Sequence, residues 1–490
     1  MLRRHFLGSG LALAAAWPLR SFAVAVEKVG DVAAKSLTGG DVIIRGTSVQ
    51  DFAASLHGDI LLSTHPDFDG TRRIWNAAFD RKPALIARCS GASDVRRAVD
   101  FAREHSLLTA VRAGGHSFSG KSTCDGGLVI DLQQMRGVRV DPIAQRAYVE
   151  AGSLLAQLDH ECAAFGLATT SGTVSHTGVA GLTLGGGYGR LGRRFGLACD
   201  NVDSFDVVTA AGQLVRASEN ENPDLFWGLR GGGGNFGVVT SIEYRLHPMD
   251  PVILGGVVLW PFEQARDVFR HYRDIAIGAP EVVNLEYVLL PGESGPVCAI
   301  EFCWSGDHGK GEAWLKTVRG FGKPIRDDVA PMPYVRLQSA NDEMLAHGKF
   351  YYAKNGFLTK LDDAGIDRIL EAYRRAPGYV LPIDPCDAAY QRVSADATAL
   401  PNRDANFWLG AIGAWPDRKG METGIVQMRT AWRDMEPLTK GFYTNLTDAD
   451  STAAEYHRNY GENLTRLVAL KAKYDPANLF RLNANVPPKL

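Results

Sequence analysis

The chain has 490 residues, of which 45% are hydrophobic and 22% charged, and its formal net charge is −2. A chain of this length exceeds one ordinary hydrophobic core, so we expect two domains or one domain with a large insertion. The balanced charge provides no concentrated basic face, which argues against nucleic acid as a partner.

Residues 1–25 have the pattern of a targeting segment. Arg3 and Arg4 precede a short apolar run, and small residues allow cleavage after Ala23 or Ala25. The run is shorter than the ~20 apolar residues needed to span a bilayer, so no stable membrane anchor is expected. The paired arginines are typical of a twin-arginine signal, which predicts export to the periplasm or medium. An ordinary secretory signal or an uncleaved anchor is the alternative.

The elements that follow predict an α+β fold. We expect a short, poorly defined lead over about 26–50, followed by helix and strand segments to about 75, and we assign residues 26–70 as an N-terminal lead. Further along, apolar runs predict strands and one segment with helical spacing predicts a helix. The strands are expected over 84–89, 107–112, 127–132 and 146–151, and the helix over 93–104.

Past Pro248 glycine becomes rarer, which indicates a second α+β unit that extends to about residue 435. Strands are expected there over 255–260 and 297–304. Near the end of the chain, apolar residues repeat at helical spacing over 451–474, which predicts one long amphipathic helix.

Seven cysteines are dispersed along the chain without CxxC pairs or metal-ligand spacing. An odd and dispersed set argues against a disulfide scaffold, and no metal site is expected. We interpret most of these cysteines as small buried hydrophobic side chains.

The first motif with chemical content is the segment 112–120, Arg-Ala-Gly-Gly-His-Ser-Phe-Ser-Gly. Two glycines after a strand free backbone N–H groups to face an anion such as phosphate. A lone histidine is usually a core or surface residue. The glycines around His116 instead favour a histidine that faces a cofactor.

The second motif is the glycine-rich segment 171–189. Its small residues, at nearly every other position, would let a flat, extended ligand lie along the backbone. The stretch 187–192 begins inside this segment, runs past its end and fits the GxGxxG dinucleotide pattern. That pattern requires a strand before the glycines and a helix after them. Glycines precede this stretch and no regular helix is expected after it, so we reject the dinucleotide interpretation.

The third motif, residues 224–240, joins a helix-like turn to a strand through four consecutive glycines, 231–234. Such a segment serves either to cradle phosphate or to let two backbones pack closely. The sequence leaves both interpretations open.

Together these segments resemble the berberine bridge enzyme-like branch of the FAD-linked oxidases, in the vanillyl-alcohol oxidase superfamily. The shared patterns are Arg-x-Gly-Gly-His-Ser, Asp-Asn-Val at 200–202 and Asp-Leu-Phe-Trp-x-Leu-Arg-Gly-Gly-Gly-Gly-Asn-Phe-Gly-Val at 224–238. A C-terminal stretch over 460–487 matches as well. The resemblance covers about half of the chain.

The resemblance implies an α+β fold in which a PCMH-type FAD-binding domain with two subdomains is built from discontinuous segments. On this basis we assign residues 71–250 to that domain and residues 436–490 to a C-terminal segment that returns to it. Residues 251–435 would form an inserted α+β substrate domain that carries an antiparallel sheet.

The cofactor implied by the resemblance is FAD, bound covalently through His116. Many relatives add a second bond from a cysteine, and the matching position here is Val174, so a single bond is expected. The resemblance and the glycine motifs also predict the other cofactor-binding residues. These are Arg112, Gly114, Gly115, Ser117, Phe118, Gly120, Thr177, Gly178, Gly181, Leu182, Gly185, Gly186, Gly187, Tyr188, Gly237, Val238, Val239 and Asn485.

The reaction implied is oxidation of a C–H bond next to oxygen or nitrogen in a small alcohol, sugar or amine. Hydride passes to the flavin, and dioxygen reoxidises the flavin to give hydrogen peroxide. Plant relatives place a tyrosine base where this chain has Leu446. This departure favours an amine, which needs little base assistance, or a base from the inserted domain.

Tyrosines elsewhere are candidates for the base. Tyr443 and Tyr188 are the two tentative choices, with Tyr352 and Tyr390 as further candidates. Alternation along an expected strand would direct Tyr443 to the same side as Asn445.

Three other functions stay open. They are a dehydrogenase that passes electrons to a quinone or cytochrome, a flavin carrier without catalysis, and a flavin-dependent oxygenase or cyclase of secondary metabolism. The sequence contains no signal for oligomeric state.

Overall fold

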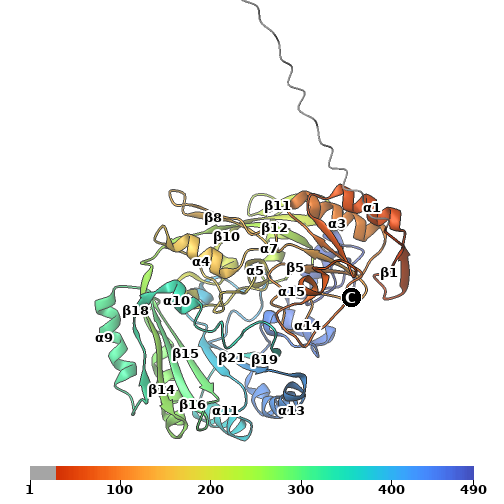
Figure 1. Ribbon diagram of the computed structural model, residues 1–490. Helices are drawn as coiled ribbons and strands as arrows, with labels where there is room; N and C mark the ends of the chain where they lie inside the picture. The colour runs from red at the N-terminus through yellow and green to blue at the C-terminus, as the bar shows by residue number, and fades with distance from the viewer. Residues whose placement is uncertain (1–28) are drawn as a thin grey trace, which may run out of the picture.

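A computed structural model of the chain describes residues 29–490. It has two large parts, one above the other in Figure 1, and each has its own hydrophobic core. The first core gathers residues from Ala34 to Leu246 and from Tyr456 to Val486, and the second runs from Leu254 to Met435. The expected α+β fold class is confirmed. The expected signal segment lies outside the described residues.

The N-terminal lead is more regular than the sequence predicts. Strands β1 (Val32–Lys35) and β2 (Asp41–Ile44) form an antiparallel hairpin, followed by helix α1 (Gly46–Ser55). The ring of Phe52 on α1 stacks on Phe101, with centroids 4.1 Å apart. The expectation of a poorly defined lead is therefore wrong, because this segment gains its order by packing on a helix that follows later in the chain.

Two sheets organise the first part. The smaller sheet has the strand order β3-β4-β6-β5. Its strand β6 pairs in parallel with both β4 and β5, and helix α3 lies beside this sheet. The larger sheet has the strand order β11-β10-β12-β8-β7. The predicted elements at 84–89, 93–104, 107–112, 127–132 and 146–151 are confirmed. The bounds are β3 (Asp59–Leu62), α2 (Phe68–Arg72), β4 (Leu85–Arg88), α3 (Ala92–Glu104), β5 (Thr109–Arg112), β6 (Leu128–Asp131), β7 (Val138–Asp141), β8 (Arg146–Glu150), α4 (Leu155–Ala163), β9 (Leu167–Ala168), α5 (Val179–Leu184), α6 (Gly192–Phe195), β10 (Val202–Thr209), β11 (Leu214–Ser218), α7 (Pro223–Leu229), β12 (Gly237–Arg245) and β13 (His247–Pro248).

The second part is built on one antiparallel sheet with the order β17-β14-β16-β15-β20-β21-β19, and β18 pairs with β14. Helices α8, α11 and α13 pack their apolar sides into its core. The strands predicted at 255–260 and 297–304 are confirmed. The bounds are β14 (Val252–Pro261), α8 (Ala265–Ala276), β15 (Val283–Leu290), β16 (Val297–Trp304), α9 (His308–Arg319), β17 (Arg326–Asp327), β18 (Ala330–Pro333), α10 (Tyr334–Gln338), β19 (Phe350–Leu358), α11 (Asp363–Arg375), β20 (Leu381–Pro385), α12 (Ala389–Arg392), β21 (Phe407–Trp415) and α13 (Arg418–Met435).

The C-terminal segment returns to the first part as two helices, α14 (Ala453–Tyr460) and α15 (Asn463–Tyr474). The single helix expected over 451–474 is wrong, because Gly461 adopts φ +53° and ends the first helix. On α15 the buried Lys471 donates to Asp475 Oδ2 at 2.6 Å and to the carbonyl of Asn235 at 2.7 Å. This lysine ties the end of the chain to the four-glycine segment.

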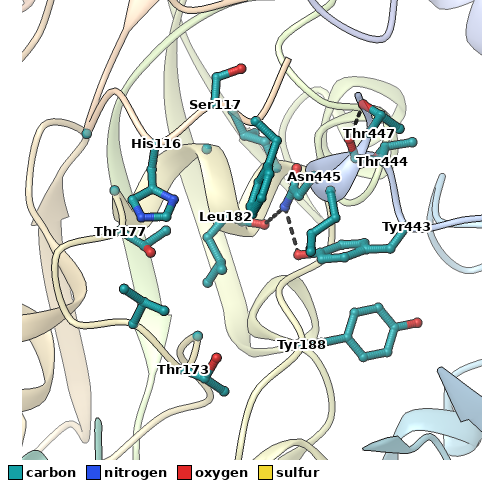
Figure 2. Close-up of a pocket in the computed structure, with 18 of the residues that line it drawn as sticks. His116, Ser117, Thr173, Thr177, Leu182, Tyr188, Tyr443, Thr444, Asn445 and Thr447 are labelled. Atoms are coloured by element: carbon teal, nitrogen blue, oxygen red, sulfur yellow. Dashed lines mark hydrogen bonds between the residues drawn. The ribbon is translucent and has the colours of Figure 1, made fainter. Parts of the chain in front are cut away.

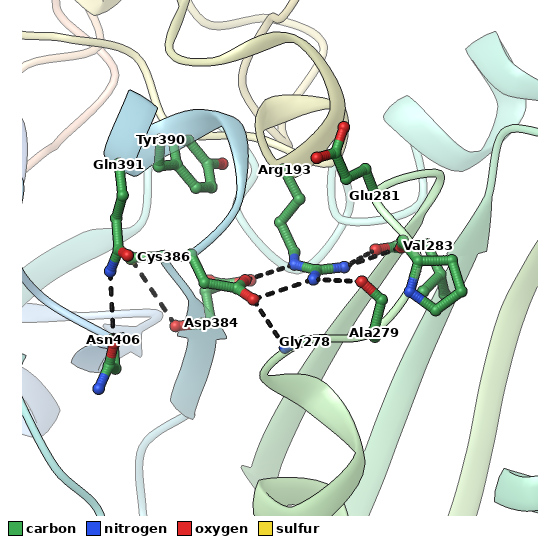
Figure 3. Close-up of polar contacts among 12 residues, drawn as sticks. Arg193, Gly278, Ala279, Glu281, Val283, Asp384, Cys386, Tyr390, Gln391 and Asn406 are labelled. Carbon is green, nitrogen blue, oxygen red and sulfur yellow. Dashed lines mark hydrogen bonds and ion pairs between the residues drawn. The ribbon is translucent and has the colours of Figure 1, made fainter. Parts of the chain in front are cut away.

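Buried ion pairs connect the two parts. Arg193 of the first part donates to both carboxylate oxygens of Asp387, at 2.6 and 3.1 Å. Figure 3 shows the same guanidinium reaching the backbone that leads from α8 into β15, where the carbonyls of Ala279 and Val283 accept from it. Arg193 thus fixes the start of a central strand of the second part from the first.

All seven cysteines are buried and unpaired, which confirms their interpretation as small hydrophobic side chains. Burial raises the pKa of the thiols of Cys124, Cys298 and Cys303 to about 12 in each case. Between residues 29 and 490, none of the helices combines the length and apolar character needed to cross a bilayer.

Candidate functional site

One cavity of about 580 Å³ lies where the two parts meet. Its volume falls within the range of small-molecule and cofactor sites. Loops of the first part line one end, strands β14, β16, β15, β20 and β21 line the other, and the C-terminal segment closes the side. The cavity therefore has two ends of different construction.

The turn that carries His116 begins at the edge of the smaller sheet. Arg112 ends β5 and pairs with Asp131, its register partner on β6, with Nη2 and Oδ2 2.6 Å apart. The guanidinium also donates to backbone carbonyls and does not line the cavity. Arg112 therefore braces the turn, and its expected role as a cofactor contact is not supported.

His116 points into the cavity from this turn (Figure 2). Its ring stacks on Trp75 with centroids 3.9 Å apart, and Tyr351 stacks on the other side of Trp75 at 3.7 Å. Nε2 of His116 is buried and has no hydrogen-bond partner. Burial, followed by the neighbouring His176 and His347, holds the pKa of His116 well below its usual value. The imidazole is thus held neutral, with one nitrogen unpaired beside a cavity.

Two further histidines extend from this position. The His176 ring lies 5.1 Å from that of His116, and His347 lies 4.9 Å beyond His176. Both ring nitrogens of His176 are buried without a partner, whereas His347 is exposed. The three rings form a row from the cavity to the surface.

The glycine-rich segment 171–189 is less extended than expected, because residues Val179–Leu184 form the short helix α5. Gly178, just before α5, packs against Gly114: a Cβ on Gly178 would lie 2.5 Å from the backbone nitrogen of Gly114. At Gly181 a Cβ would meet nothing within 4 Å, so this backbone faces the open cavity. The GxGxxG stretch follows a helix and not a strand, which confirms its rejection as a dinucleotide fingerprint.

The four-glycine segment both packs and faces the cavity. Gly231 and Gly232 press against neighbouring backbone, where a Cβ would clash. Gly233 and Gly234 line the cavity, and a Cβ on either would meet nothing within 4 Å. Both of the interpretations left open by the sequence therefore apply, each to one half of the segment.

Most of the predicted cofactor-binding residues meet at this end of the cavity. The residues that line it are Gly114, Gly115, His116, Ser117, Phe118, Thr177, Gly178, Gly181, Leu182, Tyr188, Gly237, Val238 and Val239. Val174 lines it too, whereas Cys162 and Cys199 do not. The predicted residues that do not line the cavity are Arg112, Gly120, Gly185, Gly186, Gly187 and Asn485.

The tyrosine candidates separate into two groups. Tyr443, Tyr188 and Tyr390 line the cavity, with the Tyr188 ring 5.0 Å from Tyr443 and 5.3 Å from Tyr390. The hydroxyl of Tyr352 instead bonds Arg429 and Asp450, away from the cavity. Tyr352 is therefore not part of this site.

Tyr443 and Asn445 meet as expected, although residues Thr444–Leu446 form a 3-10 turn and not a strand. Asn445 Nδ2 donates to Tyr443 Oη at 2.7 Å and to the carbonyl of Leu182 at 2.9 Å (Figure 2). Burial raises the pKa of Tyr443 to about 12. This phenol keeps its proton at neutral pH, so it is suited to donate a hydrogen bond and not to act as a base.

The opposite end of the cavity carries three carboxyl groups that sequence reasoning did not single out: Glu286, Glu301 and Asp384. Burial, together with the negative charge of Glu301, raises the pKa of Asp384 to about 7. Burial and the two neighbouring carboxylates hold the pKa of Glu286 well above its usual value. Each of the three is the one acidic residue of an otherwise largely apolar strand, and this pattern could have revealed them.

No group of three or more His, Cys, Asp or Glu side chains within residues 29–490 has the arrangement of a metal site. The site combines a neutral histidine and glycine backbone at one end with two carboxyl groups of raised pKa, Glu286 and Asp384, at the other. Perturbed carboxyl groups in a closed cavity are suited to proton transfer near neutral pH.

Comparison with known proteins finds relatives that match most of the chain. Residues 83–218 match the family described as FAD binding domain, and residues 442–487 match the family described as berberine and berberine like. An FAD-linked oxidoreductase of Dictyostelium discoideum is 31% identical over 450 residues, which span 90% of this chain and 97% of that protein. The (R)-6-hydroxynicotine oxidase of Paenarthrobacter nicotinovorans is 29% identical over 461 residues, 89% of this chain and 98% of that protein.

Solved structures agree as well. The crystal structure of 6-hydroxy-D-nicotine oxidase from Arthrobacter nicotinovorans superposes with a TM-score of 0.80 at 28% identity, covering 89% of this chain and 99% of that one. Berberine bridge enzyme in complex with (S)-reticuline has the same fold, with a TM-score of 0.82 at 20% identity, covering 91% and 99%. The chain belongs to the berberine bridge enzyme-like family of FAD-linked oxidoreductases.

Proposed function

We propose that this protein is an oxidase that holds FAD through one covalent bond to His116 and oxidises a small organic molecule, with dioxygen as the electron acceptor. The observation that carries the proposal is the imidazole of His116, which is neutral, buried and unpaired at Nε2 on the wall of the cavity. Only a neutral imidazole nitrogen has the lone pair that a new bond to carbon requires.

The residues at this end fit a flavin nucleotide. Open glycine backbone at Gly181, Gly233 and Gly234 would allow a flat ring system and a phosphate chain to approach closely. The Trp75 stack holds the imidazole of His116 in one orientation. Bound FAD would supply the acceptor for a two-electron oxidation, while the protein orients the substrate and moves protons.

A single attachment is proposed because Val174 occupies the position that matches the second attachment in many relatives. Its side chain lines the cavity and cannot form a bond to the cofactor. Cys162 and Cys199, which precede and follow it in the chain, are buried elsewhere.

Plant relatives have a tyrosine base at the position of Leu446. In this chain the carboxyl end of the cavity provides the base instead. Asp384, with a pKa of about 7, is half ionised near neutral pH and can take a proton from a substrate O–H or N–H group. Tyr443 keeps its proton and can donate a hydrogen bond to the substrate. The proposed base thus comes from the inserted domain, one of the two possibilities that Leu446 raises.

The proposal includes export by the twin-arginine route, on the basis of Arg3 and Arg4 and the small residues at Ala23 and Ala25. That route carries folded cargo, which is compatible with loading the cofactor before export. A covalent bond would also prevent loss of the cofactor afterwards.

The test is to precipitate the purified protein with acid and to measure the yellow chromophore that remains with the polypeptide. We expect wild type to retain the flavin, His116→Ala to release it, and wild type to form hydrogen peroxide in air with a substrate. Release by wild type would contradict covalent attachment, and retention by His116→Ala would reveal a second bond. Substrate-dependent flavin reduction under nitrogen without peroxide in air would indicate a dehydrogenase.

A further inference from the structure

The three carboxyl groups of the cavity lie in one row across neighbouring strands. Glu301 on β16 pairs directly with Glu286 on β15. Asp384 on β20 occupies the corresponding place on the other side of Glu286, one step beyond the Tyr287–Ile383 pair. Side chains directly opposite on adjacent strands share one face of a sheet, so all three carboxyl groups face the same space.

Apolar and aromatic residues continue this row at both ends. Val257 on β14 pairs with Glu301, and Trp408 on β21 pairs with Asp384; both side chains line the cavity. The next lining positions of the sheet are Val288, Leu290, Ala299, Val380, Pro382 and Ile412. None of these sheet residues contributes a hydroxyl or an amide side chain.

The row is short of positive charge. Arg190 is bound by Glu301 through two contacts, at 2.6 and 2.9 Å, and it also donates to Gln338. In the described chain Glu286 has no hydrogen-bond or ion-pair partner, although its carboxyl group is enclosed by protein and faces the cavity. Like charges directly opposite each other destabilise a sheet. This arrangement is costly unless Glu286 and Asp384 take up protons or a cation from outside the chain balances their charge.

We propose that the substrate is a cationic amine with an apolar body, bound with its ammonium group between Glu286 and Asp384. This inference rests on the proposed function and names the substrate class for the same cavity. A metal ion is a poor candidate for the cation, because the acidic residues have no metal-binding arrangement in the described part of the chain. A sugar would bring several hydroxyl groups, and beyond the three carboxyl groups this sheet face has no hydroxyl or amide side chain to bind them.

The aromatic residues of the cavity are consistent with the same ligand. Trp408 pairs with Asp384 across the sheet, and Tyr390 and Tyr188 line the same cavity. Aromatic faces attract organic cations through their quadrupole, and they also cover an apolar body. An amine would thus find opposite charge, cation-binding rings and apolar walls in one place.

The experiment compares three probes of similar size that differ in charge: benzylamine, benzyl alcohol and phenylacetate. Each is titrated by calorimetry under nitrogen into the purified holoprotein whose flavin has first been reduced, so that binding is measured without oxidation of the probe. We expect benzylamine to bind at least about tenfold more tightly than benzyl alcohol, and phenylacetate to bind most weakly. Equal or tighter binding of benzyl alcohol, or preferential binding of xylobiose, would overturn the proposal.

Two variants and a matched control locate the effect. Glu286→Gln and Asp384→Asn keep the side-chain size, and each should weaken benzylamine binding about tenfold while leaving benzyl alcohol unchanged. Glu293→Gln removes a carboxylate from an exposed turn of the same domain and should change neither affinity. An unchanged preference in both cavity variants would reject the inference. Failure of the flavin-retention test rejects the proposed function instead, since that test needs no ligand.

Discussion

The two ends of the cavity are built in different ways. The histidine end uses short stretches of consecutive residues, so that His116 and its glycines form a turn whose role is visible along the chain. The carboxyl end uses single residues from separate strands, and Glu286 and Asp384 are 98 positions apart in the sequence. The cofactor end is therefore specified locally, and the substrate end is specified by strand pairing.

If the ends have separate roles, a change at the carboxyl end should abolish turnover while the cofactor stays attached. We expect Asp384→Asn to lower the rate of anaerobic flavin reduction about 10³-fold, because a positioned base contributes about 10² to 10⁴. The substrate would be the best one found in a panel of amines, alcohols and sugars. Acid precipitation should show unchanged covalent flavin in the same preparation.

The pH profile provides the control for this assignment. Since the pKa of Asp384 is about 7, the wild-type rate should fall about tenfold for each unit below that value, as the base becomes protonated. Asp384→Asn should not show this fall in rate at low pH. A larger loss of rate in Tyr443→Phe than in Asp384→Asn would return the role of base to the tyrosine.

Arg193 connects the two parts of the molecule, so its replacement tests how much that connection stabilises the fold. Arg193→Met leaves the buried carboxylate of Asp387 without its partner, and the loss of one member of a buried ion pair costs about 3 kcal/mol or more. We expect urea unfolding to show this decrease in the free energy of unfolding. Arg266→Met, which breaks an exposed pair with Asp367, should change stability little. Equal effects would contradict the anchoring role of Arg193.

A smaller effect is expected from the histidine row. The His176 ring lies 5.1 Å from that of His116 and neither of its nitrogens has a hydrogen-bond partner, so we expect it to take up the imidazole proton as the covalent bond forms. His176→Ala should slow covalent attachment about tenfold, and added imidazole should restore the rate. The readout is the acid-stable flavin fraction over time. An equal loss in His160→Ala, which alters an exposed helix residue, would exclude a specific role.

Sequence patterns selected residues that mostly line one cavity, because the glycine turns that carry them are formed by consecutive residues. They failed where order comes from distant packing, as in α1, whose Phe52 stacks on Phe101. They also failed at Gly461, where helical spacing of apolar residues continued through a position that ends the helix. The carboxyl row was not predicted because its three residues come from three separate strands. Each of them is nevertheless a single acidic residue in an apolar strand, as Glu286 is in Val283–Leu290.

If the protein produces peroxide, as proposed, its buried thiols have a consequence. Peroxide attacks thiolates, and it converts accessible cysteines of low pKa to sulfenic acid. Cys124, Cys298 and Cys303 are buried with pKa values of about 12, and the other four cysteines are buried as well, so almost no thiolate meets the solvent. Peroxide formed in the proposed reaction would therefore find almost no reactive thiol on the protein, although the chain has no disulfide bonds in its described part and keeps all seven cysteines.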